Sequence, residues 1–370
     1  MRILSVVGAR PNFVKAAPVM RSLTERGVTE QTLVHTGQHY DESMSDAFFR
    51  ELGLPEPDMN LAVGSGTHAF QTAKIMERLE PVLQDMKPDL TLVYGDVNST
   101  LAAALDCAKL NLLVGHVEAG LRSRDRTMPE EINRMLTDQI ADLLFTPSAD
   151  ANDNLRREGI KEDRIHLVGN VMIDSLISLL PKARKPVIDR LQEEYILVTL
   201  HRPSNVDDPK ILDSLLSVLS EISRRVQVLF PVHPRTRMRL SGSHSVQLNH
   251  SGLRLLEPLS YLEFLGLEQS AALVITDSGG VQEETTFLGV PCLTVRENTE
   301  RPITCSLGTN ALVGQDAELI LTQVDRVLSG NLKKGARPPL WDGKAAHRIA
   351  DIVVATLNRG DKRGLGNARR

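Results

Sequence analysis

Short apolar runs alternate with helical patterns along almost the whole chain. Six runs in the first half have the composition of strands: "ILSVVG" from Ile3, "QTLVHTG" from Gln31, "DLTLVYGD" from Asp89, "LLVGHVEAG" from Leu112, "DLLFTPS" from Asp142 and "RIHLVGN" from Arg164. Helical segments lie between them, for example "THAFQTAKIMERLEPVLQDM" from Thr67. Because the runs are apolar on both faces and alternate with helices, they predict a buried parallel sheet in an α/β fold.

The pattern is interrupted at residues 181–190, a segment rich in proline and charge that suits a linker. Five further strand-like runs follow, again with helices between them: "YILVTLHR", "VQVLFPVH", "LRLLEP", "ALVITDSG" and "PCLTVR". We therefore expect two doubly wound, Rossmann-like domains, residues 1–180 and residues 191–340. Ligands of such sheets bind beyond the carboxyl ends of the strands, so the two domains are expected to face each other across a cleft.

Composition excludes several classes of function. The 370 residues are 41% apolar and 24% charged, with a net charge of −4, as in an ordinary globular protein. Lys and Arg are scattered, which argues against a nucleic-acid partner, and the basic tail at residues 359–370 is expected to be a solvated end. The three cysteines lie far apart, so neither a disulfide framework nor a zinc site is expected. The apolar run after Met1 is too short for a signal peptide or a membrane span, which predicts a cytoplasmic protein without a membrane partner.

The motif "TDSGGVQEE", Thr276 to Glu284, reads as a strand, a Ser-Gly-Gly turn and a helix. Gly279 and Gly280 let the backbone approach a ligand, and the helix N-terminus offers N–H groups to an anion such as a diphosphate. Glu284, about one and a half turns further on, is placed to accept two ribose hydroxyls. The alternative is that Ser278 only caps the helix and that Glu284 is only an acid of its first turns.

The first strand is followed by "GARPNFVK", with Arg10 before a helix-starting proline and Lys15 about one turn inside. These two cations are candidates for binding phosphate or a developing negative charge, and the alternative is that they are solvated. The chain has neither G-x-G-x-x-G after its first strand nor G-x-x-x-x-G-K-[ST]. A dinucleotide cofactor and P-loop hydrolysis are therefore disfavoured.

Three histidines follow or interrupt strand-like runs. His201 emerges directly after "YILVTL" and is a candidate acid, base or phosphate ligand, or else a structural residue. His116 lies inside a strand and is interpreted as structural, whereas His233 stays undecided. Because no metal-binding spacing such as H-E-x-x-H occurs, we expect no metal and no other cofactor.

Three carboxylates are expected at neighbouring strand ends: Asp96 and Glu118 after two strands, and Glu130 at the start of a helix. Clustered carboxylates raise one another's pKa, which supplies a proton donor and an acceptor at neutral pH. The structural alternative is a carboxylate–arginine network through Arg122, Arg126 and Arg134. The helix after Pro129 is expected to bury an apolar stripe, which consists of Ile132, Met135, Leu136, Ile140 and Leu143.

A set of motifs between residues 8 and 302 resembles the non-hydrolysing UDP-N-acetylglucosamine 2-epimerases in the order of that family: "GARPNFVK", "GQHYDESM", "YGDVNST", "GHVEAGLRS", "RTMPEEINRMLTD", "LHRPSNVD", "PVHPRT", "TDSGGVQEE" and "GVPCLTVRENTERP". The resemblance implies the two-domain architecture that one large class of glycosyltransferases shares (GT-B). It implies a homodimer without metal or nicotinamide. It also implies that a C-terminal helix at residues 341–358 crosses back onto the first domain.

The resemblance further implies the reaction and the residues that perform it. UDP leaves C1 of the sugar while the C2 proton is removed, which gives a 2-acetamidoglucal, and re-addition places the proton on the other face. By motif, Asp96, Glu118 and Glu130 match the acid/base carboxylates, and His201 matches an important histidine. The positions matched to substrate binding are Arg10, Lys15 and Arg301 for the cations, Ser278, Gly279 and Gly280 for the phosphate turn, Glu284 for the ribose, and Phe264 for the uracil.

The chain departs from the family's pattern at three places. Many bacterial members read Q-H-R-x-x-L-D-Q where this chain has "QHYDESMSD", in a region that binds a second, activating substrate molecule. Gln139 stands where a histidine is frequent. "GARPNF" also occurs in relatives that act on UDP-2,3-diacetamido-2,3-dideoxyglucuronic acid, so the sugar stays open.

Three other functions compete with this hypothesis. A glycosyltransferase of the same architecture would carry an apolar or basic acceptor surface, which the sequence does not indicate. A silent UDP-sugar-binding protein would have no reason to keep three carboxylates at neighbouring strand ends. A hydrolysing epimerase would differ only in the fate of the glucal.

Overall fold

The computed structural model describes residues 1–38, 49, 53, 56–232, 234–240, 252–331 and 333–359, without the side chains of residues 234, 235 and 238. The chain divides into two compact units, Met1–Ser175 with Pro339–Arg370, and Leu176–Pro338. The first boundary falls inside a helix, a few residues before the linker expected at residues 181–190. His233, residues 39–46 of the "QHYDESMSD" segment and the tail beyond Arg359 lie outside the described residues.

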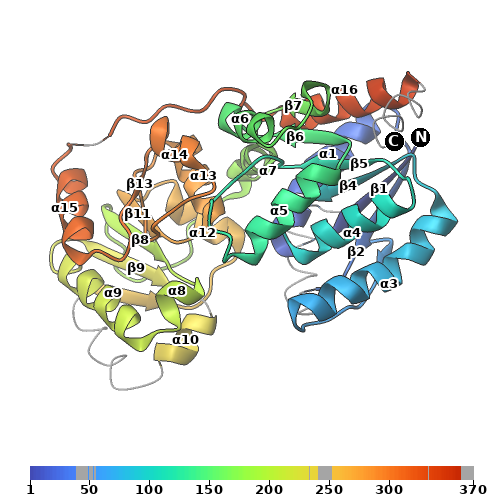
Figure 1. Ribbon diagram of the computed structural model, residues 1–370. Coiled ribbons are helices and arrows are strands. Elements are labelled where there is room, and N and C mark those ends of the chain that lie inside the picture. The colour runs from blue at the N-terminus through green and yellow to red at the C-terminus, as the bar shows by residue number, and fades with distance from the viewer. Residues whose placement is uncertain are drawn as a thin grey trace. The chain divides into compact units, whose positions relative to one another are not determined.

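The first unit is a parallel sheet of seven strands with helices on its faces (Figure 1). Its strands follow the order β3-β2-β1-β4-β5-β6-β7 and are β1 (Arg2–Val7), β2 (Glu30–His35), β3 (Met59–Asn60), β4 (Leu90–Tyr94), β5 (Val114–Val117), β6 (Leu143–Thr146) and β7 (Ile165–Leu167). Its helices are α1 (Arg10–Glu25), α3 (His68–Met86), α4 (Asn98–Lys109), α5 (Pro129–Ile140), α6 (Ala149–Arg157), the short η1 (Glu162–Arg164), α7 (Val171–Leu179), which crosses the boundary, and α16 (Ala345–Asn358). The order reverses direction between β1 and β4, the place where such sheets bind ligands.

The second unit is a parallel sheet of six strands in the order β10-β9-β8-β11-β12-β13. The strands are β8 (Tyr195–Thr199), β9 (Gln227–Pro231), β10 (Leu253–Leu256), β11 (Leu273–Thr276), β12 (Cys292–Thr294) and β13 (Asn310–Leu312). The helices are η2 (Leu180–Lys182), α8 (Pro203–Val206), α9 (Pro209–Ile222), α10 (Pro234–Leu240), α12 (Tyr261–Glu268), α13 (Gly279–Leu288), α14 (Pro302–Ser306) and α15 (Ala317–Leu328).

Alternation along β8 shows why strands that are apolar throughout form this sheet. Ile196 and Val198 pack into a core together with α9 and α15, whereas Tyr195 and Leu197 pack into a separate core on the other face. Successive side chains of a strand point to opposite faces, so a strand covered by helices on both sides needs apolar residues at every position. The predicted α/β fold of two doubly wound, Rossmann-like domains is confirmed. A cleft between the two domains stays a prediction.

Local signals set the helix ends. The Thr67 hydroxyl accepts a hydrogen bond from Phe70 N at the start of α3, and the carboxylates of Asp208 and Asp316 cap α9 and α15 in the same way. Ser260 and Glu263 form a reciprocal capping box at the start of α12. These interactions satisfy N–H groups that lack a partner inside the helix.

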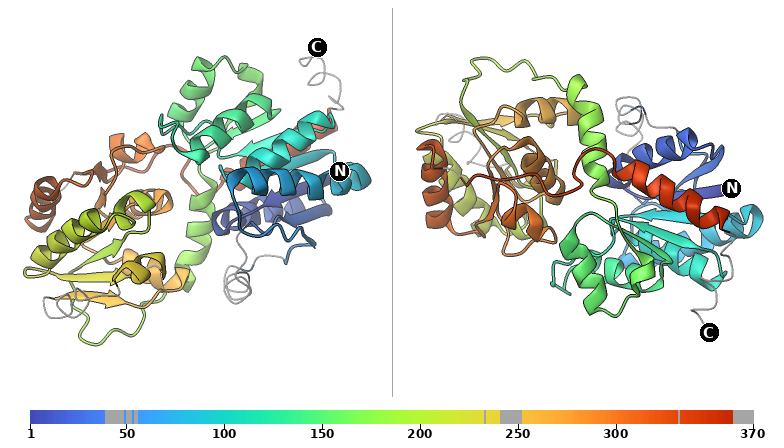
Figure 2. Two further views of the ribbon diagram at one scale, coloured as in Figure 1. Left: turned by 60° about the horizontal axis from the view of Figure 1, so that its bottom comes forward. Right: turned by 90° about the horizontal axis from the view of Figure 1, so that it is seen from above.

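Helix α16 packs against α1 within the first unit, as Figure 2 shows for the first and last helices of the chain. The Asp174 carboxylate of α7 accepts from Ala345 N (3.2 Å) and Ala346 N (2.7 Å), so one carboxylate caps the N-terminus of α16. Trp341 Nε1 donates to Pro147 O (3.1 Å). These contacts hold the end of the chain on the first unit.

The structure corrects the prediction for α5. The residues that α5 buries are polar, namely Glu131, Asn133, Arg134, Thr137 and Asp138, whereas Leu136 is 48% exposed and Leu143 belongs to β6. The apolar stripe is therefore not the buried face of this helix. An amphipathic pattern reveals two faces, and here the ionic partners on neighbouring segments decide which face points inward.

Candidate active site

The end of β5 carries a buried carboxylate on strained backbone. Glu118 follows β5 with a φ of +76°, a conformation that is costly for a residue with a Cβ. The N–H groups of Glu118 and Ala119 both donate to Phe145 O at 3.0 Å, which fixes this conformation. The Glu118 side chain is 7% exposed and forms an ion pair with Lys15 Nζ of α1, itself buried. Two sequence candidates from distant segments are therefore brought together.

Gly95, after β4, packs against this ion pair. A Cβ on Gly95 would lie 3.0 Å from Lys15 Nζ and 3.4 Å from Glu118 Oε2, and its φ of +66° also favours glycine. Asn12 of α1 donates through Nδ2 to Tyr94 O (2.8 Å), and its Oδ1 accepts from Gly8 N (3.1 Å). The side chain of Asn12 thus joins the loops that follow β1 and β4.

A small pocket opens beside this pair. It is lined by residues at the ends of β5, β6 and β7, together with Lys15: Val117, Glu118, Phe145, Pro147, Val168, Gly169, Asn170, Val171 and Met172. Asn170 Oδ1 accepts from Met172 N (2.9 Å), and the buried Asn170 Nδ2 has no hydrogen-bond partner among the described residues. The charged and polar side chains of the pocket are thus those of Lys15, Glu118 and Asn170.

Asp96 is held by a different cation. Its Oδ2 lies 2.7 Å from Arg134 Nη2 of α5, and its side chain is 31% exposed. Arg134 also pairs with Glu131 (3.1 Å), whose carboxylate accepts from Ser123 N, Ser123 Oγ and Arg124 N. Part of the expected carboxylate–arginine network therefore exists, and Glu131 is its buried member.

Glu130 occupies the first turn of α5 and is partly exposed. Among the described residues, no hydrogen bond or ion pair joins it to Asp96 or Glu118. Its convergence with these two carboxylates stays a prediction.

His116 is fully buried in a second ionic network beneath these groups. Its Nε2 donates to Gly95 O (2.7 Å), and its Nδ1 lies 2.7 Å from Asp138 Oδ1. Asp138 also pairs with Arg122 (2.8 Å), which in turn pairs with Glu158 (2.6 Å). Burial opposes ionisation of Asp138, but the charges of His116 and Arg122 hold its pKa below the ordinary value. His116 thus positions the Gly95 turn, as expected for a structural histidine.

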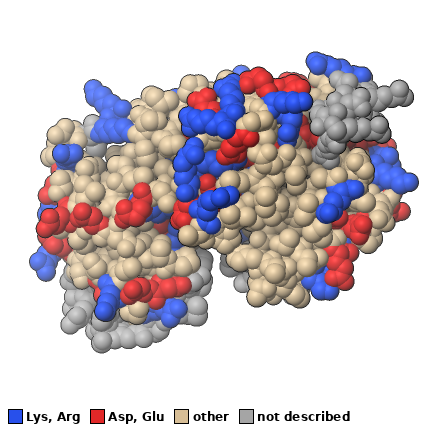
Figure 3. Space-filling view, in the orientation of Figure 1, with Lys and Arg blue, Asp and Glu red and all other residues tan. Residues whose placement is uncertain are grey.

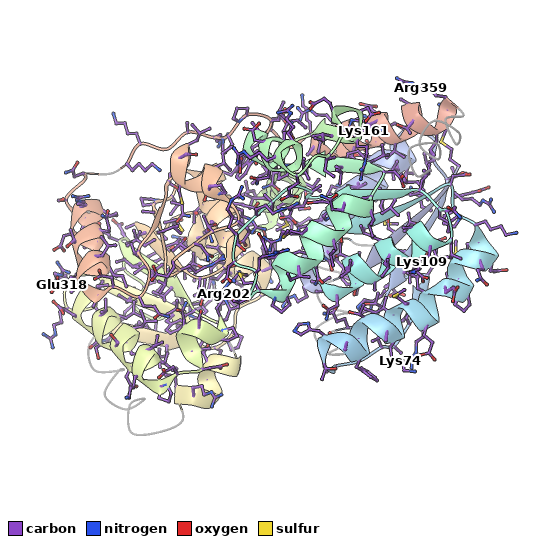
Figure 4. The ribbon with its side chains drawn as sticks, viewed as in Figure 1. Lys74, Lys109, Lys161, Arg202, Glu318 and Arg359 are labelled. Carbon is purple, nitrogen blue, oxygen red and sulfur yellow. The ribbon has the colours of Figure 1, made fainter. Side chains whose placement is uncertain are left out.

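In the second unit, His201 lies after β8 with its side chain 39% exposed and its Nδ1 3.0 Å from Asp277 Oδ1. Asp277, after β11, is fully buried and also accepts from His201 N, Arg202 N and Asn205 Nδ2. Burial disfavours its charge, but these partners hold its pKa below the ordinary value. Arg202, labelled in Figure 4 at the start of α8, donates through Nε to Asp277 O (3.0 Å). Sequence reasoning missed Asp277, although it ends a strand in the same way as Asp96.

The Ser278-Gly279-Gly280 turn starts α13 beside Arg301. A Cβ on Gly279 would lie 2.5 Å from Arg301 Nη1 and 2.8 Å from Glu300 Oε1, whereas nothing lies within 4 Å of a Cβ on Gly280. Arg301 pairs with Glu300 and with Glu283 (2.8 Å). The Ser278 hydroxyl makes no capping hydrogen bond. A guanidinium thus lies against the turn at a helix N-terminus, an arrangement that suits an anion.

The other candidates of this unit lie on α12 and α13. Glu284 is buried and accepts a hydrogen bond from Tyr261 Oη at 2.6 Å. Phe264 is partly buried against the apolar core to which both α12 and α13 contribute. In the first unit, Arg10 is the first residue of α1 and is exposed.

Within the residues that the structure describes, no group of three or more His, Cys, Asp or Glu side chains is placed to hold a metal ion. No helix in the described ranges is both long and apolar enough to cross a membrane. On the face in Figure 3, Lys and Arg side chains lie among Asp and Glu side chains.

The protein is an α/β protein of two Rossmann-like units, each with a candidate site at the ends of its strands. The first site has a Lys–Glu pair beside a pocket, and the second has a Ser-Gly-Gly turn against an arginine. A lipopolysaccharide outer core galactosyltransferase resembles this chain in its fold only, with 13% sequence identity and a TM-score of 0.57. The family model for UDP-N-acetylglucosamine 2-epimerase matches residues 21–354. The chain belongs to this family of enzymes.

Three relatives illustrate the family. The UDP-N-acetylglucosamine 2-epimerase of Methanococcus maripaludis is 45% identical over 94% of this chain and 97% of its own. The UDP-2,3-diacetamido-2,3-dideoxy-D-glucuronate 2-epimerase of Pseudomonas aeruginosa is 43% identical over 96% of this chain and 99% of its own. The crystal structure of the Methanocaldococcus jannaschii UDP-GlcNAc 2-epimerase, in complex with UDP-GlcNAc and UDP, has a TM-score of 0.86 and 42% identity over 96% of this chain and all of its own.

Proposed function

We propose that this enzyme interconverts UDP-N-acetylglucosamine and UDP-N-acetylmannosamine by elimination and re-addition of UDP. A base removes the C2 proton, the C1–O bond breaks with its electron pair passing to UDP, and a C1–C2 double bond forms. UDP oxygen then attacks C1 while a proton is delivered to the opposite face of C2. The observation that carries this proposal is the buried Lys15–Glu118 pair, a proton-transfer group and a cation beside one pocket.

The proposed roles divide between the two domains. In the first, Asp96, Glu118 and Glu130 are the acid/base carboxylates, and Arg10 and Lys15 neutralise charge. Asp96 and Glu118 each have a cationic partner, Arg134 and Lys15 respectively. We do not assign the base and the acid among them.

In the second domain, the proposed roles concern UDP and the departing diphosphate. The Ser278-Gly279-Gly280 turn and Arg301 bind the diphosphate, Glu284 accepts the ribose hydroxyls, and Phe264 lies near the uracil. His201 acts on the leaving group, with Asp277 fixing its ring. The close packing of Gly279 against Arg301 supports the phosphate role.

The test is proton NMR with UDP-N-acetylglucosamine in D₂O, without acceptor or added cofactor. We expect UDP-N-acetylmannosamine carrying deuterium at C2, with traces of UDP and the glucal. Products without deuterium would contradict proton exchange with solvent. No reaction at all would reject this substrate.

A second substrate is favoured by one specific finding. The relative named for UDP-2,3-diacetamido-2,3-dideoxy-D-glucuronate is nearly as similar to this chain as the relative named for UDP-N-acetylglucosamine. The same NMR experiment with that uronic acid nucleotide decides between the two, since kcat/KM will be larger for the true substrate.

We further propose that the enzyme is a homodimer. Leu136 on α5 is an apolar side chain that is 48% exposed, and a second copy would cover it. Light scattering after size exclusion tests this, with Leu136→Lys expected to weaken the dimer. The cytoplasmic location stays a prediction.

A further inference from the structure

Two carboxyl groups lie together inside the second domain without a cation. Glu268, the last residue of α12, is 0% exposed, and Glu284 of α13 is 4% exposed. No Lys, Arg or His of the described residues forms an ion pair with either. No N–H or hydroxyl group there donates to either Glu268 oxygen, and after burial the neighbouring charge that opposes its ionisation is that of the Glu284 carboxyl.

Such a pair must hold a proton. Two carboxylates have acceptors only, so a hydrogen bond between them requires that one be protonated. Two adjacent negative charges in an apolar interior are also strongly disfavoured. The geometry decides which group keeps the proton: Tyr261 Oη donates to Glu284 Oε1 at 2.6 Å, which stabilises the charge on Glu284. Glu268 therefore carries the proton.

We propose that Glu268 is a positioning residue for nucleotide binding: as a neutral carboxylic acid it donates a hydrogen bond to Glu284 and, with Tyr261, presents the Glu284 carboxylate to the ribose hydroxyls. This inference rests on the proposed role of Glu284. A carboxylate has about four lone-pair sites. Two donors from the protein leave about two of them for the vicinal hydroxyls of one ribose.

The arrangement makes UDP binding sensitive to pH. Burial raises the pKa of Glu268 well above its ordinary value, and burial, with the nearby charge of Glu283, raises that of Glu284 to about 7. Below that pH a second proton enters the pair and Glu284 becomes neutral. UDP affinity is therefore fully present above about pH 7 and declines as the pH falls through it.

Tyr261 and Cys292, two other titratable groups near the pair, stay protonated over this range. Burial raises the pKa of Tyr261 on α12 well above its ordinary value and that of Cys292 on β12 to about 12. Glu283 on α13 is paired with Arg301 at 2.8 Å. Because the variants differ from the wild type only at residue 268, a difference in midpoint between the proteins reports on the Glu268–Glu284 pair.

The test is calorimetric titration of UDP between pH 5.5 and 8.5 into the wild-type enzyme, Glu268→Gln and Glu268→Met. The terminal phosphate of UDP titrates near pH 6, but equally for all three proteins, so differences between them isolate the pair. The glutamine amide is still a donor to Glu284, and this variant should keep the wild-type midpoint. Methionine cannot donate, so the midpoint should rise by about one pH unit, with about fivefold weaker binding at pH 7.

Each other outcome overturns the proposal. A midpoint that moves to lower pH in both variants would mean that Glu268 is ionised in the wild type, since both substitutions then relieve repulsion. An unchanged midpoint in Glu268→Met, in a protein with a normal melting temperature, would leave Glu268 only a structural role.

Two further measurements separate this proposal from the role of Glu284. The infrared spectrum of the nucleotide-free enzyme at pH 8 should contain a protonated carboxyl band that Glu268→Gln lacks; its presence in both proteins would reject the protonated Glu268. If 2′-deoxy-UDP binds like UDP at every pH, the ribose assignment fails, whatever the infrared result.

Discussion

The two domains bury carboxylates near the ends of their strands in opposite ways. In the first domain, Glu118 lies against Lys15, Asp96 against Arg134, and Asp138 against Arg122. In the second domain, Glu283 has Arg301, but Glu268 and Glu284 have no cation among the described residues and share a proton instead. The same side chain is therefore an anion in one setting and a neutral donor in the other.

The difference teaches that cationic partners can outweigh burial in setting the protonation of a carboxyl. Asp138 and Glu268 are both 0% exposed. Burial opposes the charge of both, but His116 and Arg122 hold the pKa of Asp138 below its ordinary value, whereas burial and then the charge of Glu284 raise the pKa of Glu268 well above it. The first domain thus gives its carboxylates cationic partners, and the second is proposed to keep a hydrogen-bonded acceptor for a neutral hydroxyl.

The largest effect is expected from Glu118→Gln. The amide keeps the shape of Glu118 but has no basic oxygen, so turnover should fall about 10²–10⁴-fold. UDP binding should survive, because the proposed UDP site belongs to the second domain. Initial rates and the Kd of UDP check this. Retained turnover would remove Glu118 from the catalytic assignment, and the same test applies to Asp96→Asn.

Arg122 has one fully buried partner, Asp138, and one partly exposed partner, Glu158. Substituting each in turn compares how much the two ion pairs contribute to stability. Asp138→Asn removes the fully buried carboxylate that pairs with Arg122 and should lower the free energy of unfolding by about 3–5 kcal/mol. Glu158→Gln, whose side chain is 24% exposed, should cost less than about 1 kcal/mol. Urea unfolding of both variants measures the difference. Equal losses would show that the depth of the ion pair does not matter here.

The pH dependence of stability should have opposite signs in the two networks. The pKa of Asp138 is lowered in the folded state, so its contribution is present above the ordinary carboxyl pKa and is lost as the pH falls. The pKa of Glu268 is raised above 4.5, so the wild type should lose stability relative to Glu268→Gln as the pH rises, by about 1.4 kcal/mol per pH unit. Urea unfolding between pH 5 and 8 tests Glu268, and urea unfolding below the ordinary aspartate pKa of 3.8, compared with Asp138→Asn, tests Asp138. A constant difference between the wild type and Glu268→Gln would contradict the buried proton.

The smallest effect is expected at the glycine turn of the nucleotide-free enzyme. Gly279→Ala would place a Cβ 2.5 Å from Arg301 Nη1, so we expect a loss of about 1–3 kcal/mol. Gly280→Ala is the control, since nothing lies within 4 Å of its Cβ. Thermal unfolding without nucleotide compares the two. A lower Tm for Gly280→Ala than for Gly279→Ala would contradict the packing of Arg301 on this turn.

Most of the fold could be predicted because its strands are buried on both faces. Eleven strand-like runs in the sequence correspond to strands of the two sheets. The two strands that were missed, β3 (Met59–Asn60) and β13 (Asn310–Leu312), are two- and three-residue strands at the edges of the sheets. An edge strand this short has too few residues to show alternation, and its pairing depends on the neighbouring strand.

The sequence by itself determined the succession of strands and helices and the chemical groups at the strand ends, because local hydrophobic periodicity and turn residues encode both. The tertiary structure alone decided which face of α5 is buried and which cation each carboxylate meets. It also decided that Glu268, an ordinary helix-end acid in the sequence, contacts Glu284. These outcomes depend on pairs such as Lys15 and Glu118, separated by 103 residues, whose contact only the folded backbone creates.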